Sequence, residues 1–247
     1  FSFREFINLQ TGNSFQPYTL DEILRNHEHI IKQILPKVSP MKYFQDYLHH
    51  GFYPFFLENR NFTENLLKTM NMMTEVDILL IKQIELKYLT KIKRLFYQLA
   101  VEGAKAPNVS QLAEEINTSR ATVMNYIKYL ADARLINMIY PTGQEFPKKP
   151  SKVMMHNSNL MYAIYPIQID KQEVMETFFV NSLWKDHKVS QTGKDHYFIV
   201  DGEKKFRICD AQSPNKVRNN PDIIYARYNT EVGKDNRIPL WLLGFLY

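Results

Sequence analysis

The sequence predicts a mainly α-helical protein that ends in an α/β part. Apolar residues at helical spacing dominate the first third of the chain, and two short capped helices follow one another closely in the middle. Strand-like runs joined by a tight turn occupy the last third. We therefore expect a helical segment over 1–85, a helix-turn-helix unit over 86–156 and an α/β unit over 157–247.

The first 85 residues contain the patterns of amphipathic helices. Thr19 and Glu22 form a capping box, because each side chain can accept a hydrogen bond from a free backbone N–H. Apolar side chains then recur at helical spacing as far as Pro36, which cannot continue a helix. Further helices are predicted from Met41 to His50 and after Asn61. The stripe behind the capping box consists of Leu20, Ile23, Leu24, His27, Ile30, Ile31 and Ile34.

Charge and cysteine content limit the classes of function. The net charge is +5, and residues 86–155 contain 11 Lys and Arg but 5 Asp and Glu, so the positive charge is concentrated in the middle. A local basic field is what a polyanionic partner needs. The one cysteine, Cys209, excludes an intrachain disulfide and a zinc site built from cysteines, which fits a reducing cytoplasm. No apolar run is long enough to span a bilayer, and no signal peptide precedes the first helix, so we expect no membrane partner.

The clearest motif is a helix-turn-helix over 108–130, which follows an amphipathic helix predicted over 88–101. Asn108 and Ser119 can cap its two helices, and Asn117 is a residue type that tolerates the left-handed conformation of a tight turn. A strand through Tyr140, a loop over 141–151 with three prolines and a return strand over 152–156 come next. The expected arrangement is a winged helix-turn-helix, and the stripe predicted to be buried in its second helix is Val123, Ile127 and Leu130.

Polar and basic residues of this unit are the predicted DNA contacts. The N-terminal half of a second helix of this kind enters the major groove, where Arg can bind guanine, Asn can bind adenine and Lys can contact a phosphate. Lysines at the wing could contact the DNA backbone or the minor groove. The residues predicted to bind DNA are Arg120, Thr122, Asn125, Lys128, Lys148, Lys149 and Lys152.

The last third combines a helix with strands. A helix is predicted over 173–184, and strands are predicted over 196–200, 205–210 and 222–227. Asp201-Gly202 is the kind of dipeptide that joins two strands of a hairpin. The apolar stretch 240–247 is expected to fold onto the body of the protein as a helix or a strand.

Short blocks spread along the chain resemble one protein family, the prokaryotic AAA+-type ATPases whose C-terminal domain has no known function. The resemblance implies an ATPase core ahead of Phe1, with ATP and Mg²⁺ as its cofactors. Because this chain contains no Gly-x-x-x-x-Gly-Lys-Ser/Thr motif, it is not expected to hydrolyse ATP by itself. Arg4 could reach that nucleotide, although an ordinary exposed arginine is the simpler expectation. Besides the helix-turn-helix, the blocks are residues 2–6, 159–162, 176–183 and 237–247.

The resemblance also implies a PD-(D/E)XK nuclease-like fold for the C-terminal domain, with a degenerate site. Such nucleases hold Mg²⁺ with acids on adjacent strands and orient water with a lysine. Here Tyr197 occupies the position of the first acid, Arg207 that of the second and Cys209 that of the lysine. Only Glu176, on the preceding helix, keeps its acidic type. The acids that could substitute are Asp195, Asp201 and Asp210.

Three functions stay open at this stage. The first is a nucleic-acid-binding and regulatory module of an AAA+-type ATPase, with DNA and its own ATPase core as partners. The second is a protein-interaction or oligomerisation module, for instance one that binds a second copy of itself. The third is a metal-dependent nuclease, which the degenerate site disfavours. No catalytic set, metal site or cofactor is predicted within the chain itself.

Overall fold

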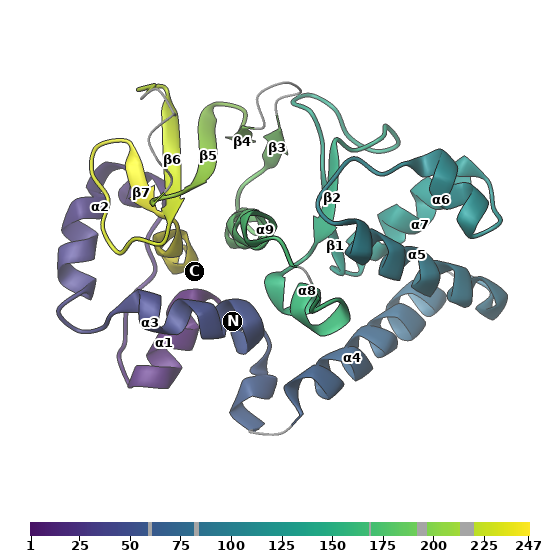
Figure 1. Cartoon of the computed structure of the whole chain (residues 1–247), viewed down its shortest axis with the longest axis horizontal. Coiled ribbons are helices and arrows are strands. Elements are labelled where there is room, and N and C mark those ends of the chain that lie inside the picture. Colours follow the sequence, from purple (N-terminus) through teal and green to yellow (C-terminus); the bar gives the residue numbers. More distant parts are fainter. Residues whose placement is uncertain (59–60, 82–83, 168, 192–196, 213–219) are drawn as a thin grey trace.

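The computed structural model describes residues 1–247 except 59–60, 82–83, 168, 192–196 and 213–219, and no side chain is described at 77 and 79–81. About half of the chain is helical, and the strands form a two-stranded and a five-stranded sheet. This α/β mixture agrees with the predicted class at that level. In Figure 1, helix α9 lies near the centre, with α6 and α7 towards one end of the molecule and α2 towards the other.

Capping boxes begin the first two helices. In α2 the Thr19 hydroxyl accepts a hydrogen bond from the Glu22 N–H at 3.2 Å, and the Glu22 carboxylate accepts one from the Thr19 N–H at 2.7 Å, which confirms the prediction. A second box, formed by Ser2 and Glu5, begins α1, which the sequence analysis missed. The elements of this part are α1 (Phe3–Thr11), α2 (Leu20–Ile34), α3 (Pro40–Asp46), η1 (Tyr47–Gly51), η2 (Pro54–Glu58), α4 (Phe62–Met72) and η3 (Met73–Ile81).

The helix predicted over 41–50 is correct only in part, because its second half is a π-helical turn, η1. Asn159, a buried residue far along the chain, binds the backbone of this turn. Its amide nitrogen donates to the carbonyl oxygens of Tyr47 and Leu48 at 3.0 and 2.9 Å. Its amide oxygen accepts from the N–H of Phe52 at 2.9 Å. A tertiary side chain therefore adds hydrogen bonds to the backbone of this π-helical turn.

The middle of the chain contains two short helices followed by a hairpin. Strands β1 and β2 pair antiparallel, with Ile136 opposite Met155 and Ile139 opposite Lys152. A short helix that the sequence analysis missed, α8, follows the hairpin and is capped by Asn157. The elements are η4 (Leu86–Tyr88), α5 (Leu89–Glu102), α6 (Val109–Glu115), α7 (Arg120–Asp132), β1 (Ile136–Ile139), β2 (Lys152–Met155) and α8 (Ser158–Ile164).

The five-stranded sheet has the order β3-β4-β5-β6-β7, in which β3, β4 and β5 are antiparallel and β5, β6 and β7 are parallel. Asp201 and Gly202 both have positive φ, at 54° and 79°, so the predicted turn joins β4 to β5. Residue 196, at the start of the first predicted strand, lies outside the described part. The elements are α9 (Lys171–Leu183), β3 (Val189–Gln191), β4 (Phe198–Val200), β5 (Lys204–Asp210), β6 (Ile223–Tyr228), β7 (Arg237–Pro239) and η5 (Leu240–Phe245).

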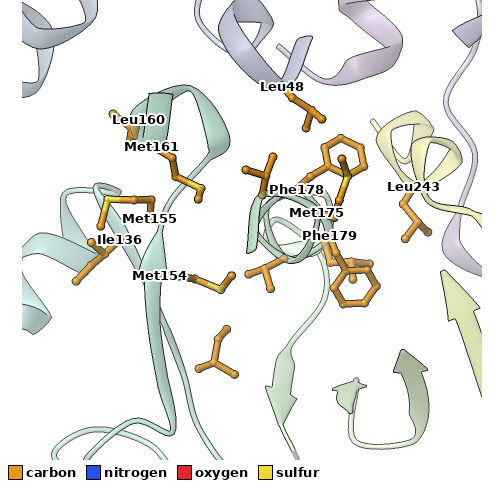
Figure 2. Packing of buried hydrophobic residues seen from close by; sticks show 14 of the residues in the cluster. Leu48, Ile136, Met154, Met155, Leu160, Met161, Met175, Phe178, Phe179 and Leu243 are labelled. Atoms are coloured by element: carbon orange, nitrogen blue, oxygen red, sulfur yellow. The ribbon is translucent and has the colours of Figure 1, made fainter. Parts of the chain in front are cut away.

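Helix α9 is the centre of the hydrophobic core. Its side chains face several elements at once, with β2 and α8 on one side and η5 on the other (Figure 2). The Phe179 ring lies 5.3 and 5.2 Å from the rings of Phe198 and Phe206 on the sheet. The C-terminal stretch is fully enclosed as η5, where Trp241 is 1% exposed, and it also packs on α1, α2 and α3. The expectation that residues 240–247 fold onto the body is therefore confirmed.

His156, directly after β2, makes the stability of the fold depend on pH. Burial and the nearby Arg134 guanidinium lower the pKa of His156 to about 4, against about 6.5 in an unfolded chain. Between these values the unfolded state binds more protons than the folded state, so the free energy of unfolding falls as the pH falls. We expect about 2–3 kcal/mol to be lost between pH 7 and pH 4.5 in urea titrations. A His156→Phe variant should lose less over the same range, and an equal loss in both proteins would contradict this role.

Candidate nucleic-acid interface

Local capping and a left-handed turn position α6 and α7. The Asn108 side chain accepts a hydrogen bond from the Gln111 N–H at 3.3 Å, and the Ser119 hydroxyl accepts one from the Thr122 N–H at 3.1 Å. Asn117 has a φ of 49°, and the next N–H, that of Thr118, donates to a carbonyl of α6. Both predicted caps and the predicted turn are confirmed. The stripe predicted to be buried in α7 is also confirmed, with 0% exposure at Val123, Ile127 and Leu130.

The loop over 141–151, between β1 and β2, is anchored to the five-stranded sheet at its base. The Thr142 and Ser190 hydroxyl oxygens lie 3.1 Å apart, and the Gln191 N–H donates to the Tyr140 carbonyl at 3.0 Å. The base of the loop is therefore connected to β3. This contact holds the base of the loop, while Lys148 and Lys149 near its middle are exposed.

A pocket of about 350 Å³ lies where the first turns of α6 and α7 meet the loop. It includes three of the residues predicted to bind DNA: Arg120 and Asn125 from α7, and Lys149 from the loop. Residues 29 positions apart in sequence thus line one recess. The other lining residues, which the sequence analysis did not single out, are Asn108, Val109, Ser110, Ala121, Met124, Phe146 and Pro147.

Polar groups at this recess are available to a ligand. Arg120, Asn125 and Lys149, which line it, and the neighbouring Lys148 are exposed, and within the described part of the chain their side chains form no ion pair or hydrogen bond. Thr122 is partly buried, and its hydroxyl oxygen lies 2.8 Å from that of Ser119, so it also supports the helix cap. The recess therefore contains positive charges that no carboxylate of the described chain neutralises, together with an amide side chain.

Two of the predicted DNA contacts are engaged elsewhere. Lys128 is paired with Asp132 one turn further along α7. The Lys152 ammonium lies 2.6 Å from a Glu176 carboxylate oxygen, and the Lys152 side chain is 12% exposed. The assignment of Lys152 to the wing surface is therefore corrected: its side chain points inward to α9, where it neutralises a half-buried carboxylate.

The positions of the degenerate nuclease-like site do not form one site. Arg207 and Cys209 alternate on β5 with Phe206 and Ile208, which are buried on the side of α9, so they face away from Glu176. The centre of the Tyr197 ring lies 5.9 Å from the guanidinium carbon of Arg207, so Tyr197 is grouped with Arg207.

The acids that could have substituted are also dispersed. Asp201 binds His187 at 2.7 Å, and Asp210 accepts hydrogen bonds from Asn229 and from the Gln212 N–H at 2.9 and 2.8 Å. Asp195 lies outside the described residues. Among the residues that are described, no three His, Cys, Asp or Glu side chains are grouped as metal ligands would be.

Arg4 is not the exposed arginine expected from the sequence. Its side chain is 14% exposed, and its guanidinium donates to the carbonyl oxygens of Phe15 (2.9 Å) and Tyr247. It thus joins the loop after α1 to the residues after η5. This structural role accounts for an arginine at the position.

Comparison with known proteins places the chain in a family without an assigned function. A family model described as a domain of unknown function (DUF8612) matches residues 41–171, just over half of the chain. This chain belongs to that family. An uncharacterized protein of Methanocaldococcus jannaschii, MJ1637, is 26% identical over 148 residues, which are 58% of this chain and 31% of that protein. The match thus spans about a third of its length.

No solved structure gives a significant match to the chain. Within the described residues, no helix is both long and apolar enough to cross a membrane. The family region covers α6, α7, the hairpin and the recess between them, and it ends at the start of α9. The candidate interface therefore lies entirely inside the region that defines the family.

Proposed function

We propose that this protein binds DNA through α7 and the 141–151 loop, as the winged helix-turn-helix of a larger AAA+-type ATPase. In this proposal α7 enters the major groove and the loop is the wing. Arg120 and Asn125 contact base edges, while Lys148 and Lys149 contact phosphates.

The observation that supports this function most strongly is the recess shared by α7 and the loop. It brings together a guanidinium and an amide from α7 and an ammonium from the loop, and no carboxylate of the described chain pairs with them. A guanidinium and an amide are the two groups best suited to distinguish guanine and adenine. Residues 86–155 have an excess of six positive charges, which would attract a polyanion to the same region.

The ATPase context rests on the resemblance of the short sequence blocks. An N-terminal core with ATP and Mg²⁺ would supply the energy of hydrolysis, and the present chain would supply recognition. The contact between the loop and β3 offers a route by which DNA binding could influence the α/β part. On this view the chain alone binds DNA and does not hydrolyse ATP.

Fluorescence anisotropy with a labelled 20-base-pair duplex tests the proposal. If Lys148 and Lys149 neutralise two phosphates, affinity should fall roughly 12-fold between 50 and 200 mM salt, from a slope of about −0.9 per contact. Absence of binding at 50 mM salt, or binding that does not respond to salt, would contradict the proposal.

Exposed apolar side chains on neighbouring helices in the sequence favour a second function, protein interaction. Five large apolar side chains on the consecutive helices from α4 to α5 are exposed, which is unusual for a surface without a partner. Light scattering during gel filtration separates the two functions, because a stable dimer that binds no DNA would favour this alternative. The residues are Met72, Val76, Leu86, Tyr97 and Val101.

A further inference from the structure

The outer face of the five-stranded sheet is basic at its parallel end. Side chains alternate between the two faces of the sheet along each strand. Phe206 and Ala226 lie on the inner face, towards α9, and their neighbours in β5 and β6 lie on the outer face. Cys209 lies opposite Arg227, and Tyr225 lies between Arg207 on one side and Arg237 on the other. On this outer face Lys205 is exposed, Arg207, Cys209, Arg227 and Arg237 are partly buried, and Ile223, Tyr225 and Pro239 are buried.

The three arginines are close enough to act on one ligand. A strand spacing of about 4.8 Å and a two-residue rise of about 6.6 Å put the Cβ atoms of Arg207 and Arg227, and of Arg227 and Arg237, roughly 8 Å apart. Burial raises the pKa of the Cys209 thiol, the guanidinium groups of Arg227, Arg207 and Arg237 each lower it, and Asp210 has the smallest effect, which raises it. Cys209 therefore lies in the field of three cations.

No acid balances this charge within the described strands. Asp210 is the single acidic residue of β5, β6 and β7, and it projects to the opposite face, where Asn229 binds it. Arg227 donates to the Ala211 carbonyl, and the Arg207 guanidinium lies over the Tyr197 ring at 5.9 Å. No ion pair involves Arg207, Arg227 or Arg237 in the described part of the chain. Like charges gathered on one face, held by neutral partners, are what a multiply charged anion would bind.

We propose that this arginine face, centred on Cys209 and composed of Arg207, Arg227 and Arg237, is a second phosphate-binding surface that contacts the backbone of a nucleic-acid strand. Guanidinium groups bind phosphate oxygens in pairs, and their spacing suits adjacent phosphates. The aromatic ring of Tyr197, next to Arg207, offers a surface on which an unpaired base could stack. The face would then hold the same nucleic acid whose duplex part is bound at α7, or a single strand separated from it. This role adds to the proposed function, and its evidence is independent of α7.

Cys209 provides a reporter for this face, since the chain contains one cysteine. A dianionic aromatic disulfide should react with Cys209 faster than a neutral dipyridyl disulfide of similar size, by about tenfold at low salt. High salt, or the Arg207→Gln/Arg237→Gln variant, should remove most of this preference. The measurement on the wild-type protein needs no variant, so it stays informative if the variant folds poorly.

Binding of a labelled 20-nucleotide single strand and of the 20-base-pair duplex then tests the role itself. Arg207→Gln/Arg237→Gln should weaken binding about tenfold and reduce the salt slope by about 2, because two phosphate contacts are lost. Arg207→Lys/Arg237→Lys keeps the charges and should recover most of the affinity. The matched control is Arg25→Gln/Lys32→Gln, which removes two exposed charges from α2 and should leave binding unchanged.

Protection of Cys209 separates this inference from the proposed function. Saturating nucleic acid should slow the reaction of Cys209 with the neutral disulfide, even in a protein whose recess between α7 and the loop has been altered by Arg120→Glu/Lys149→Glu. If Arg207→Gln/Arg237→Gln weakens single-strand binding more than duplex binding, the unpaired strand is the ligand of this face. Unchanged affinity and salt slope in Arg207→Gln/Arg237→Gln, together with no protection of Cys209, would overturn the inference whatever α7 does.

Discussion

Arg120→Glu combined with Lys149→Glu should lower duplex affinity at 100 mM salt about 100-fold, which is about 2.7 kcal/mol. The two side chains line one recess, Arg120 from α7 and Lys149 from the loop, and have no partner in the described chain. Each substitution removes a favourable contact and adds a charge that repels phosphate, so the two effects act in the same direction. Anisotropy titration of both proteins with the same duplex gives the ratio of dissociation constants.

The control for this double variant is Arg25→Glu/Lys32→Glu on α2. It changes the net charge by the same amount at two exposed positions remote from the recess. If the control weakens binding as much as the recess variant does, the attraction is a general effect of net charge and α7 is not the contact. Circular dichroism of each variant confirms that the helices are intact.

Phe179→Ala should destabilise the folded protein by about 4 kcal/mol, because a fully buried aromatic ring leaves a cavity when it is removed. Phe179 is 0% exposed and contacts rings on both β4 and β5. In a chain of 247 residues this corresponds to a fall of roughly 10 °C in Tm, measured by thermal unfolding.

Leu57→Ala is the matched control, since Leu57 is a large apolar residue that is 53% exposed. Its free energy of unfolding should change by less than about 0.5 kcal/mol. A loss below about 1 kcal/mol for Phe179→Ala would show that α9 is not the centre of the core.

Local signals made much of the fold predictable. The capping box of Thr19 and Glu22, the left-handed Asn117 and the Asp201-Gly202 turn each depend on residues a few positions apart, so the sequence contains all the information they need. The same applies to the buried stripe of α7. The capping box at Ser2 was equally visible and was overlooked, and β3 and β7 have three residues each, too few for a period of two to be recognised.

The errors involve partners that are far away in sequence. Lys152 was expected at the wing surface, but its partner Glu176 is 24 residues further on. Arg4 looked like a surface residue, yet it binds a carbonyl 243 positions away. The π-helical turn after α3 is bound by Asn159, more than 100 residues distant. No local pattern could have revealed these contacts.

The candidate site was also predictable from local signals only, and not where it depends on residues far apart in sequence. The helix caps and stripe predicted which face of α7 is exposed, so Arg120 and Asn125 could be chosen from the sequence. The contribution of Phe146 and Lys149 to the same recess depends on the path of the 141–151 loop, which periodicity does not define. The arginine face was hidden for a similar reason, since Arg207, Arg227 and Arg237 come together only when β5, β6 and β7 pair in their observed register.

Site-specific photo-crosslinking tests the central claim most directly. A photoreactive phenylalanine analogue would replace Asn125 on α7 in one protein and Arg25 on α2 in another, and each protein would be irradiated with the labelled duplex. The proposed interface predicts a covalent protein–DNA product from position 125 and almost none from position 25. Binding of the duplex without a crosslink from position 125, or equal crosslinking from both positions, would contradict the proposal that α7 contacts DNA.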